Sequence, residues 1–425
     1  MTAREFISRI TEVDRVLLVN PFVERVRVEM ERARIHRWAE VEIIRVHTDA
    51  GIVGYGETVQ NYTWGRVELE ARVIGRSPFE LMWDDSLGAG LQMALFDAAG
   101  KLAGVPVYRL LGRKIRDWCP ISFWDIDMSP DRYAVEATTA VQLGYTSIKI
   151  KARPWFDVYE TVALISAVTP DYFSIDVDWN DFLVNVSNAV PVLRELERAF
   201  PKIKIFEGPI RADDIAGNKL LRSKIQTAIA HHFGSIPAHT AIGEGYCDGF
   251  VIGGGVQKII MDGQVAAMAN MPFFLQMVGT GLTTALSLHL GAVLTHAQWP
   301  AVTCHELYQH NLLTQRLEIV SGLSKVPDAP GLGVMVDESA LTKYSVQVAD
   351  FALTRRLVKY HRASGMDVYF REDSHPDSIM WEYFSRVNCP VYERGVSTEL
   401  LYDDGSHEFA KLYADAMREP IVKCV

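Results

Sequence analysis

The sequence predicts an α/β protein whose parallel strands close into a barrel. Strand-like and helix-like segments alternate from residue 119 to residue 305, as in sheets whose parallel strands are joined by helices. Successive apolar segments end in Lys149 and Lys151, in Asp178 and in Glu207, about 30 residues apart, the length of one strand plus one helix. Barrel strands converge at their C-terminal ends, so these side chains are expected around one pocket. An open doubly wound sheet is the alternative.

The bulk composition is that of an ordinary soluble protein. Of the 425 residues, 48% are hydrophobic and 23% are charged, close to the globular average. The formal net charge of -10 disfavours nucleic acid or anionic membrane as the main partner, because both bind basic patches. The net charge does not exclude a small anionic substrate, because a local binding site can be positively charged on a protein whose net charge is negative.

The cysteines and the N-terminus indicate a cytoplasmic protein. The five cysteines are scattered without a CxxC pair, which is typical of unpaired thiols in a reducing compartment. The N-terminus has no long apolar region of the kind that marks a signal peptide. No apolar run reaches the length of about 18 residues that a membrane span requires.

The first part of the chain predicts a hairpin and a helical region. Alternating residues from 38 to 60 turn at Thr48–Gly51, which indicates two antiparallel strands. Residues 78 to 112 are expected to be helical, and Val105-Pro106 ends the main helix within this region. Within them one apolar face recurs at helical spacing: Leu91, Ala94, Leu95, Ala98 and Leu102.

The middle of the chain supplies eight strand candidates, which favour a closed barrel over an open sheet. They begin near residues 120, 147, 173, 203, 227, 249, 273 and 302. Helix candidates between them include 157–168, 183–199, 257–270 and 281–297. No GxGxxG follows the first strand, so a dinucleotide site is not expected. Gly253–Gly255 reads as a turn, with anion binding through its backbone N–H groups as the alternative.

The last eighty residues form a different region. They are rich in aromatic and charged residues and show little pattern before an expected helix at 407–418. We interpret residues 346–425 as a C-terminal extension that packs on the body of the protein or on a neighbouring subunit.

Four separated motifs resemble the enolase superfamily, specifically its mandelate racemase/muconate lactonising branch. The resemblance covers roughly residues 38 to 345 and rests on the segments Thr48–Glu57, Met93–Lys101, Gly104–Gly112 and Val326–Val334. It implies a (β/α)7β TIM-like barrel with an α+β N-terminal capping domain. The expected boundaries are 1–115 for the capping domain, 116–310 for the barrel and 311–345 for the return to the capping domain.

Lys149 and Lys151 lie two apart on an expected strand, so both side chains point to the same side. The bland alternative is a pair of solvated lysines at a strand end. The resemblance implies a KxK motif in which Lys151 takes the proton next to a carboxylate and Lys149 helps to hold that carboxylate. Positive charge nearby is expected to lower the pKa of Lys151 toward the working pH.

Asp178 and Glu207 match the positions of the family's metal ligands on strands three and four. Asp176 competes with Asp178, which we prefer because Asn180 completes a DxN pattern. The resemblance implies that Asn180 supports the ligands or contacts the substrate. The alternative is that both carboxylates are ordinary surface groups at strand ends.

Strand five departs from the family pattern. Two histidines, His231 and His232, stand where the family supplies a third carboxylate, and we expect His232 to be the ligand with His231 next in line. Mg²⁺ prefers oxygen ligands, so an imidazole in the set would also admit Mn²⁺ or Fe²⁺. The alternative is a structural histidine without a metal contact.

Strands six and seven depart as well. Relatives carry an Asp and a His there as a second acid/base, whereas this chain has Gly253 and Gln276. Lys258 lies too far into the following helix to replace a strand-six lysine. The base on the opposite face of the substrate is therefore missing in both common forms.

The resemblance also implies three substrate contacts. Glu306, after strand eight, resembles a glutamate that hydrogen-bonds the substrate carboxylate, and His305 is expected to point away from it. Tyr62 and Trp64 follow the hairpin, where relatives place a loop that covers the substrate. Interface aromatics are the alternative for these two.

Together these residues predict metal-dependent removal of the proton alpha to a carboxylate. Without a second base we favour dehydration of an acid sugar to a 2-keto-3-deoxy acid. A racemase or epimerase of a 2-hydroxy acid is the second hypothesis, and a non-catalytic descendant with a degenerate site is the third. The expected partners are a small carboxylate substrate and further copies of the chain, because relatives are commonly even-numbered assemblies.

Overall fold

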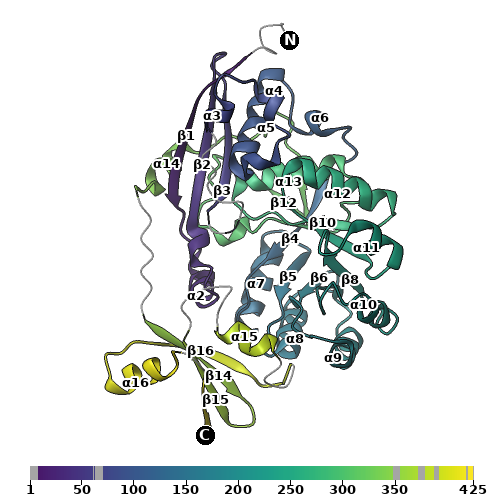
Figure 1. Ribbon diagram of the computed structural model, residues 1–425, viewed down its shortest axis with the longest axis vertical. Helices are drawn as coiled ribbons and strands as arrows, with labels where there is room; N and C mark the ends of the chain where they lie inside the picture. Colours follow the sequence, from purple (N-terminus) through teal and green to yellow (C-terminus); the bar gives the residue numbers. More distant parts are fainter. Residues whose placement is uncertain are drawn as a thin grey trace. The chain divides into compact units, whose positions relative to one another are not determined.

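The computed structural model describes residues 8–60, 62, 70–347, 355–371, 379–386, 392–417 and 420–424 (Figure 1). The chain forms two compact units, each assembled from separated segments. The first comprises Met1–Arg25, Arg37–Trp124 and Gly249–Asp350, and the second comprises Val26–His36, Asp125–Asp248 and Phe351–Val425. These units cut across the boundaries expected from the sequence, which stay predictions.

The first unit contains the predicted hairpin within a three-stranded antiparallel sheet, in the order β1-β2-β3. Helix α5 packs closely on this sheet because β3 carries glycines. A Cβ on Gly54 or Gly56 would lie 2.2 or 2.0 Å from a carbonyl oxygen of α5. The elements are β1 (Ile10–Val19), β2 (Glu40–Thr48), β3 (Val53–Val59), α3 (Glu70–Val73), α4 (Pro78–Leu81), η2 (Asp85–Leu87), α5 (Ala89–Ala103) and α6 (Tyr108–Leu111).

The first unit also holds four of the eight predicted parallel strands. β4 pairs with β11, and β9 pairs with β10, each time in parallel. The antiparallel pair β12–β13 extends β4 on its other side. The elements are β4 (Trp118–Trp124), β9 (Gly249–Ile252), α12 (Val256–Met268), β10 (Phe273–Leu275), α13 (Gly281–Val293), β11 (Ala301–Val302), η3 (His305–Leu307), β12 (Ile319–Val320), β13 (Leu323–Lys325) and α14 (Glu338–Tyr344).

The other four predicted strands form a parallel sheet in the second unit, where each strand pairs with the next along the chain. The mixed α/β class and its parallel strands are confirmed, whereas closure into a barrel stays a prediction. The elements are α2 (Glu24–Arg32), α7 (Pro130–Gln142), β5 (Ser147–Lys151), α8 (Val158–Val168), β6 (Ser174–Asp178), α9 (Val186–Ala199), β7 (Ile203–Glu207), α10 (Ile215–Arg222), β8 (Ala228–His232) and α11 (Ala238–Glu244). The short helix η1 (His36–Ala39) begins at the last residue of the segment Val26–His36, and its other residues belong to the first unit.

The C-terminal extension is more regular than its sequence suggested. Four antiparallel strands form a sheet in the order β16-β14-β15-β17, and the expected helix is confirmed as α16. Leu357, Phe409 and Ala416 form its buried core. The elements are β14 (Arg356–Arg362), β15 (Met366–Arg371), α15 (Ile379–Ser385), β16 (Ser397–Tyr402), α16 (His407–Asp415) and β17 (Ile421–Cys424).

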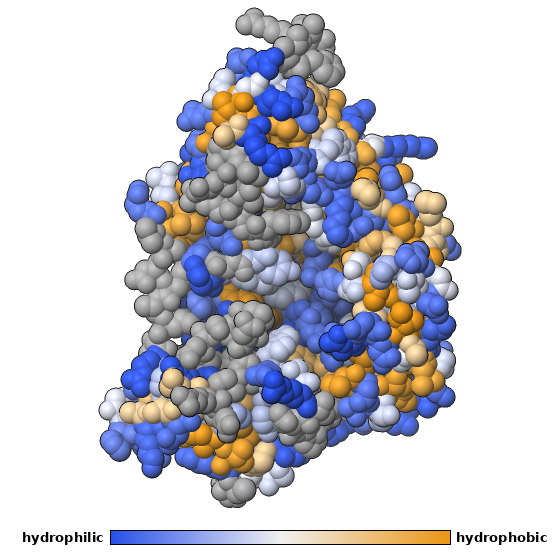
Figure 2. Space-filling view, in the orientation of Figure 1, coloured by the Kyte–Doolittle hydropathy of each residue, from blue (hydrophilic) through white to orange (hydrophobic). Residues whose placement is uncertain are grey.

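Hydrophilic and hydrophobic residues are interspersed on the face in Figure 2. Throughout the described ranges, no helix has the length and apolar character that crossing a membrane requires.

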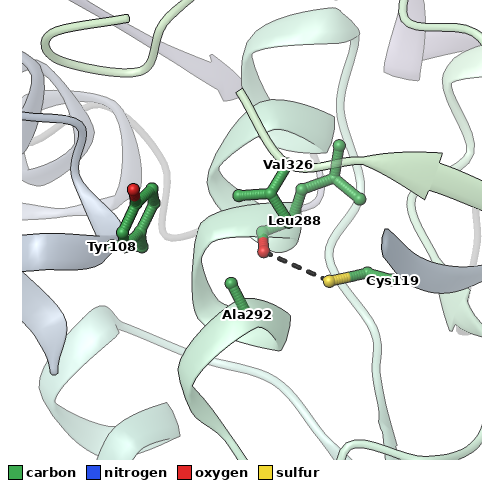
Figure 3. Close-up of a cluster of buried hydrophobic side chains, with 5 residues drawn as sticks. All are labelled: Tyr108, Cys119, Leu288, Ala292 and Val326. Atoms are coloured by element: carbon green, nitrogen blue, oxygen red, sulfur yellow. Dashed lines mark hydrogen bonds between the residues drawn. The ribbon is translucent and has the colours of Figure 1, made fainter. Parts of the chain in front are cut away.

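A buried cluster joins α6, β4 and α13 in the first unit. Leu288 and Ala292 of α13 lie between Tyr108 on one side and Cys119 on the other (Figure 3). The Cys119 thiol donates to the Leu288 carbonyl oxygen over 3.4 Å. Burial raises the pKa of Cys119 to about 12, so the group stays a neutral thiol that packs as a small apolar residue.

His289 lies beside this cluster and is buried in its neutral form. Its Nε2 lies 3.0 Å from the Leu332 carbonyl oxygen, and its Nδ1 accepts from the Tyr108 backbone N–H over 3.3 Å. This pattern assigns the proton to Nε2, because Nδ1 is needed as an acceptor. Burial lowers the pKa of His289 to about 4.

This burial predicts a loss of stability in mild acid. The unfolded chain protonates His289 near pH 6.5 and the folded chain near pH 4, so the unfolded state binds more protons between them. The free energy of unfolding should therefore fall by roughly 2 kcal/mol from pH 7 to pH 5 through this residue. In His289→Gln, whose amide can make both bonds, urea unfolding should show a smaller fall. The exposed control His239→Gln should behave as wild type, and an unchanged pH dependence in His289→Gln would refute the assignment.

Candidate active site

Four predicted side chains meet at the C-terminal ends of β5, β6 and β7. Lys151 Nζ lies 2.5 Å from Asp178 Oδ2, and Lys149 Nζ lies 3.4 Å from the same oxygen. Lys149 also forms an ion pair with Glu207. The Lys149, Asp178 and Glu207 side chains are at most 2% exposed, and Lys151 is 12% exposed.

Strand register produces this meeting. The partner of Lys151 on β6 is Asp178, and the partner of Asp178 on β7 is Glu207. Side chains two apart on a strand share a face, so Lys149 lies one layer below Lys151, opposite Asp176. A shift by one residue would turn every charge to the other face.

The two lysines have different electrostatic environments. Burial disfavours the charge on Lys149, but Glu207 and Asp178 outweigh it and hold its pKa above the usual range. Burial lowers the pKa of Lys151, and the charges of Lys149 and Arg153 add to this against the opposing pull of Asp178. Lys151 is therefore the lysine that gives up its proton more easily.

Asp176 and Asp178 share a strand face but favour different protonation states. Burial alone would raise the pKa of Asp178, yet the ammonium groups of Lys151 and Lys149 hold it well below its usual range. Burial raises the pKa of Asp176 well above its usual range, and the Glu207 charge adds to this. Asp178 is thus the ionised member of the pair.

Asn180 lies next to the Lys151 amine. Its Oδ1 is 3.3 Å from Lys151 Nζ and accepts from Arg153 Nη1 over 2.6 Å. Its backbone N–H donates to Asp178 Oδ1 over 3.0 Å. The backbone of Asn180 and Asp181 is left-handed, with φ of 44° and 66°, which is strained for non-glycine residues and is common at functional sites.

Arg153 is a site residue that the sequence reasoning missed. Its side chain is 4% exposed and reaches Asn180 from the segment after β5. The available signal was the continued alternation Lys149, Lys151, Arg153, which places a third cation on the same side of the chain.

The two histidines of β8 are adjacent on the strand, so their side chains point to opposite faces. Ala230 is the β8 partner of Glu207, so His232 shares the Glu207 face and His231 does not. His231 is buried, with Nε2 2.9 Å from Asn218 Oδ1 on α10, and burial lowers its pKa to about 4. His232 is half-exposed, with Nε2 3.4 Å from Glu207 Oε1.

The first unit contains the other predicted residues. Glu306 is buried and held by His305, whose Nε2 lies 3.3 Å away, and by Arg316. Burial alone would raise the pKa of Glu306, but its contacts with His305 and Arg316 hold it below its usual range. The expectation that His305 and Glu306 point to opposite sides is wrong, because β11 ends at Val302 and Cys304, with φ of 62°, turns the chain into η3.

Gln276 and Tyr62 contact one another, and Trp64 lies outside the described residues. Gln276 Nε2 is 3.5 Å from Tyr62 Oη, at the limit of a hydrogen bond. A Cβ on Gly253 would lie 2.6 Å from the Gln276 carbonyl oxygen, which explains the glycine at this strand end. Lys258 lies in α12 and pairs with Asp262.

The donor chemistry at Glu207 fits a divalent cation. Asp178 and Glu207 supply adjacent buried carboxylates, and Glu207 Oε1 has no hydrogen-bond partner within the described residues. His232 Nε2 is the third group, close to that oxygen. Across the described part of the chain, no three His, Cys, Asp or Glu side chains are already gathered as a metal-binding group, so binding would require His232 or the lysines to shift.

A family model described as "Enolase C-terminal domain-like" matches residues 132–340. N-succinyl-L-Arg/Lys racemase from Bacillus cereus is 31% identical over 207 residues, 43% of this chain and 55% of that enzyme, so the match spans about half of it. Arabinonate dehydratase from Saccharolobus solfataricus is 24% identical over 342 residues, 72% of this chain and 90% of that enzyme. The solved structure of muconate cycloisomerase from Pseudomonas fluorescens is similar with a TM-score of 0.65 and 21% identity, covering 80% of this chain and 99% of that one.

The two aspartates of β6 provide a matched test of the charge arrangement. Asp178→Asn should lower the free energy of unfolding by roughly 3 kcal/mol, because it leaves two buried ammonium groups short of a partner. Asp176→Asn replaces a carboxyl that favours its neutral form and should change it by less than about 1 kcal/mol. Urea unfolding at neutral pH measures both. Equal losses in the two variants would contradict the assigned charges.

Proposed function

Because the chain belongs to the enolase superfamily, in its mandelate racemase/muconate lactonising branch, we propose that it removes the proton alpha to a carboxylate. The observation that carries the proposal is the Lys151 amine, which is buried against Asp178 and Asn180. Burial and two neighbouring cations lower the pKa of Lys151, and a base works best when its pKa approaches the working pH.

Each site residue has a role in this proposal. Lys151 Nζ accepts the proton, while Asn180 Oδ1 fixes the direction of that nitrogen. Lys149 stays protonated and adds positive charge close to the carboxylate whose negative charge grows in the transition state. Asp178, Glu207 and His232 would hold Mg²⁺, or with an imidazole ligand Mn²⁺ or Fe²⁺, and the ion would supply further positive charge for that carboxylate.

Dehydration of an acid sugar is the reaction we favour. Lys151 takes the proton from C2, the hydroxyl on C3 leaves with a returned proton as water, and the enol becomes a 2-keto-3-deoxy acid. The relatives that match most of the chain are named as dehydratases: arabinonate, D-gluconate and D-galactonate dehydratases match 72%, 74% and 74% of it. The matches to the named racemase and epimerase cover 43% and 45%.

Racemisation or epimerisation is the second candidate. The racemase from Bacillus cereus has a higher identity, 31%, than the dehydratases over its shorter match. The reaction needs a second base on the far face of the substrate, whereas strand seven ends in Gln276, an amide that does not titrate. This chemical difference makes dehydration the better-supported reaction.

A panel of acid sugars assayed with Mg²⁺ or Mn²⁺ tests the proposal. Wild type should release a 2-keto-3-deoxy acid from at least one of them, and chelation should abolish turnover. Lys151→Ala should lower kcat at least about 100-fold, because it removes the base, and Glu207→Gln should weaken the response to the metal. Lys204→Ala is the matched control, since Lys204 lies on β7 but is exposed.

Other outcomes separate the alternatives. Deuterium exchange into recovered substrate without elimination would select the racemase or epimerase. Undiminished turnover in Lys151→Ala would refute the assigned base. Neither product nor exchange from any acid sugar would favour a non-catalytic descendant.

A further inference from the structure

The C-terminal extension contacts the residues that flank the proposed base and the proposed ligand. Tyr392 Oη donates to the carbonyl oxygen of Ala152 over 3.0 Å, and Ala152 separates Lys151 from Arg153. The Tyr392 ring packs edge-on against Trp179, with centroids 4.8 Å apart, and Trp179 separates Asp178 from Asn180. Both active-site segments are therefore fixed from the same side.

A second set of contacts connects the extension to Lys151 through Arg153 and Asn180. The Arg153 guanidinium lies 4.8 Å from the centre of the Trp381 ring on α15, within the range of a cation–π interaction. Arg153 Nη1 donates to Asn180 Oδ1 over 2.6 Å, and that oxygen lies 3.3 Å from Lys151 Nζ. An uninterrupted series of contacts thus joins the extension to the amine.

Three rings lie against the Arg153 guanidinium, and Trp381 is the nearest, at 4.8 Å, compared with 5.6 Å for Phe182 and 5.9 Å for Trp155. The ion pair of Arg153 with Asp127 is loose, with Nε 3.7 Å from Oδ1, and its buried Nε has no hydrogen-bond partner within the described residues. A cavity of about 40 Å³ adjoins it, lined in part by Arg32, Asp127 and Trp381. One water needs about 10–15 Å³, so the cavity leaves the guanidinium room to turn once the Trp381 ring is gone.

Two further residues of the extension, Arg394 and Gly395, anchor it to α8 and α9. The Gly395 backbone N–H donates to Asp157 Oδ2 over 2.7 Å at the start of α8. Arg394 pairs with Glu195 at 2.6 Å and lies 4.0 Å from the Tyr159 ring centre. The matched family model ends at residue 340, so this support comes from beyond the part of the chain that defines the family.

We propose that the C-terminal extension is a positioning element of the active site, in which Trp381 holds Arg153 so that Asn180 faces Lys151. Tyr392 holds the residue before Arg153 through the Ala152 carbonyl oxygen and the residue before Asn180 through the Trp179 ring. The inference deepens the proposed function and rests on it for its kinetic consequence. Its structural content, that Trp381 covers and orients Arg153, stands independently of any reaction.

The test compares ring variants of Trp381 in the full-length protein. Trp381→Leu should lower kcat about 100-fold with KM changed less than about threefold, because a misplaced base slows chemistry more than binding. Trp381→Phe keeps an aromatic face and should recover most of the loss. Tyr383→Leu is the matched control, since Tyr383 lies on the same helix and packs on Phe370 and Phe384.

A chemical readout keeps the inference testable without turnover. Phenylglyoxal modification of Arg153, followed by peptide mass spectrometry, reports whether the guanidinium is covered. Arg153 should be protected in wild type, Trp381→Phe and Tyr383→Leu, and should react at least tenfold faster in Trp381→Leu. Protection in all four proteins, or equal effects of Trp381→Leu and Tyr383→Leu on kcat and on Arg153, would overturn the proposal.

The two readouts separate the two proposals. If no acid sugar is turned over but Arg153 becomes reactive only in Trp381→Leu, the proposed function fails and the positioning role stands. If wild type turns over substrate and Trp381→Leu does so equally well, the positioning role fails and the proposed function stands.

Discussion

Two buried ammonium groups held between two buried carboxylates are the constraint on which the structure of the second unit depends. An isolated charge is very unfavourable in a protein interior, and only close pairing with good geometry makes it tolerable. Here the pairing crosses three strands, since Lys149 contacts both Asp178 and Glu207 while Lys151 contacts Asp178. The register of β5, β6 and β7 is therefore fixed by charge as well as by the apolar faces of the strands.

The same pairing gives the two lysines different chemistry without different residue types. Lys149 is completely buried and has two carboxylate neighbours, so its charge is well compensated. Lys151 has one carboxylate neighbour and lies near two other cations, so its charge is compensated less well. Position along the strand decides this difference. Lys149 is one layer deeper, where Glu207 reaches it, and Lys151 lies at the strand end, where Asn180 contacts it and Arg153 acts on its charge. A pair of identical side chains can in this way supply one permanent cation and one base.

Short-range sequence patterns predicted the elements that form between residues close together in the chain. The eight strand positions, the hairpin at β2 and β3, and the helices α8, α9, α12 and α13 follow from short-range periodicity and turn residues. The meeting of Lys151, Asp178 and Glu207 followed from spacing, since each ends a strand of one parallel sheet. The extension was missed as a sheet because β14 pairs with β16, about 40 residues later in the chain, and no short window contains both strands. Arg153 was missed because its partner Trp381 lies even further along the chain. The turn at Cys304 was missed because it depends on one left-handed residue, which the alternation of residues does not reveal.

Strand parity also accounts for the unusual strand-five position. The β8 residue beside Glu207 is Ala230, so β8 supplies no side-chain oxygen at the level of the two carboxylates. His232 shares that face two residues further along, which places its imidazole beyond Glu207 and nearer to solvent. His231 points to the opposite face, where Asn218 and the Tyr246 ring hold it in the layer of the helices. One histidine therefore belongs to the packing of the sheet and the other to its open end, and only the second can contribute a nitrogen to chemistry at Glu207. Asp178 and Glu207 are two carboxylates, and their two negative charges match the two ammonium groups of Lys149 and Lys151 that they contact.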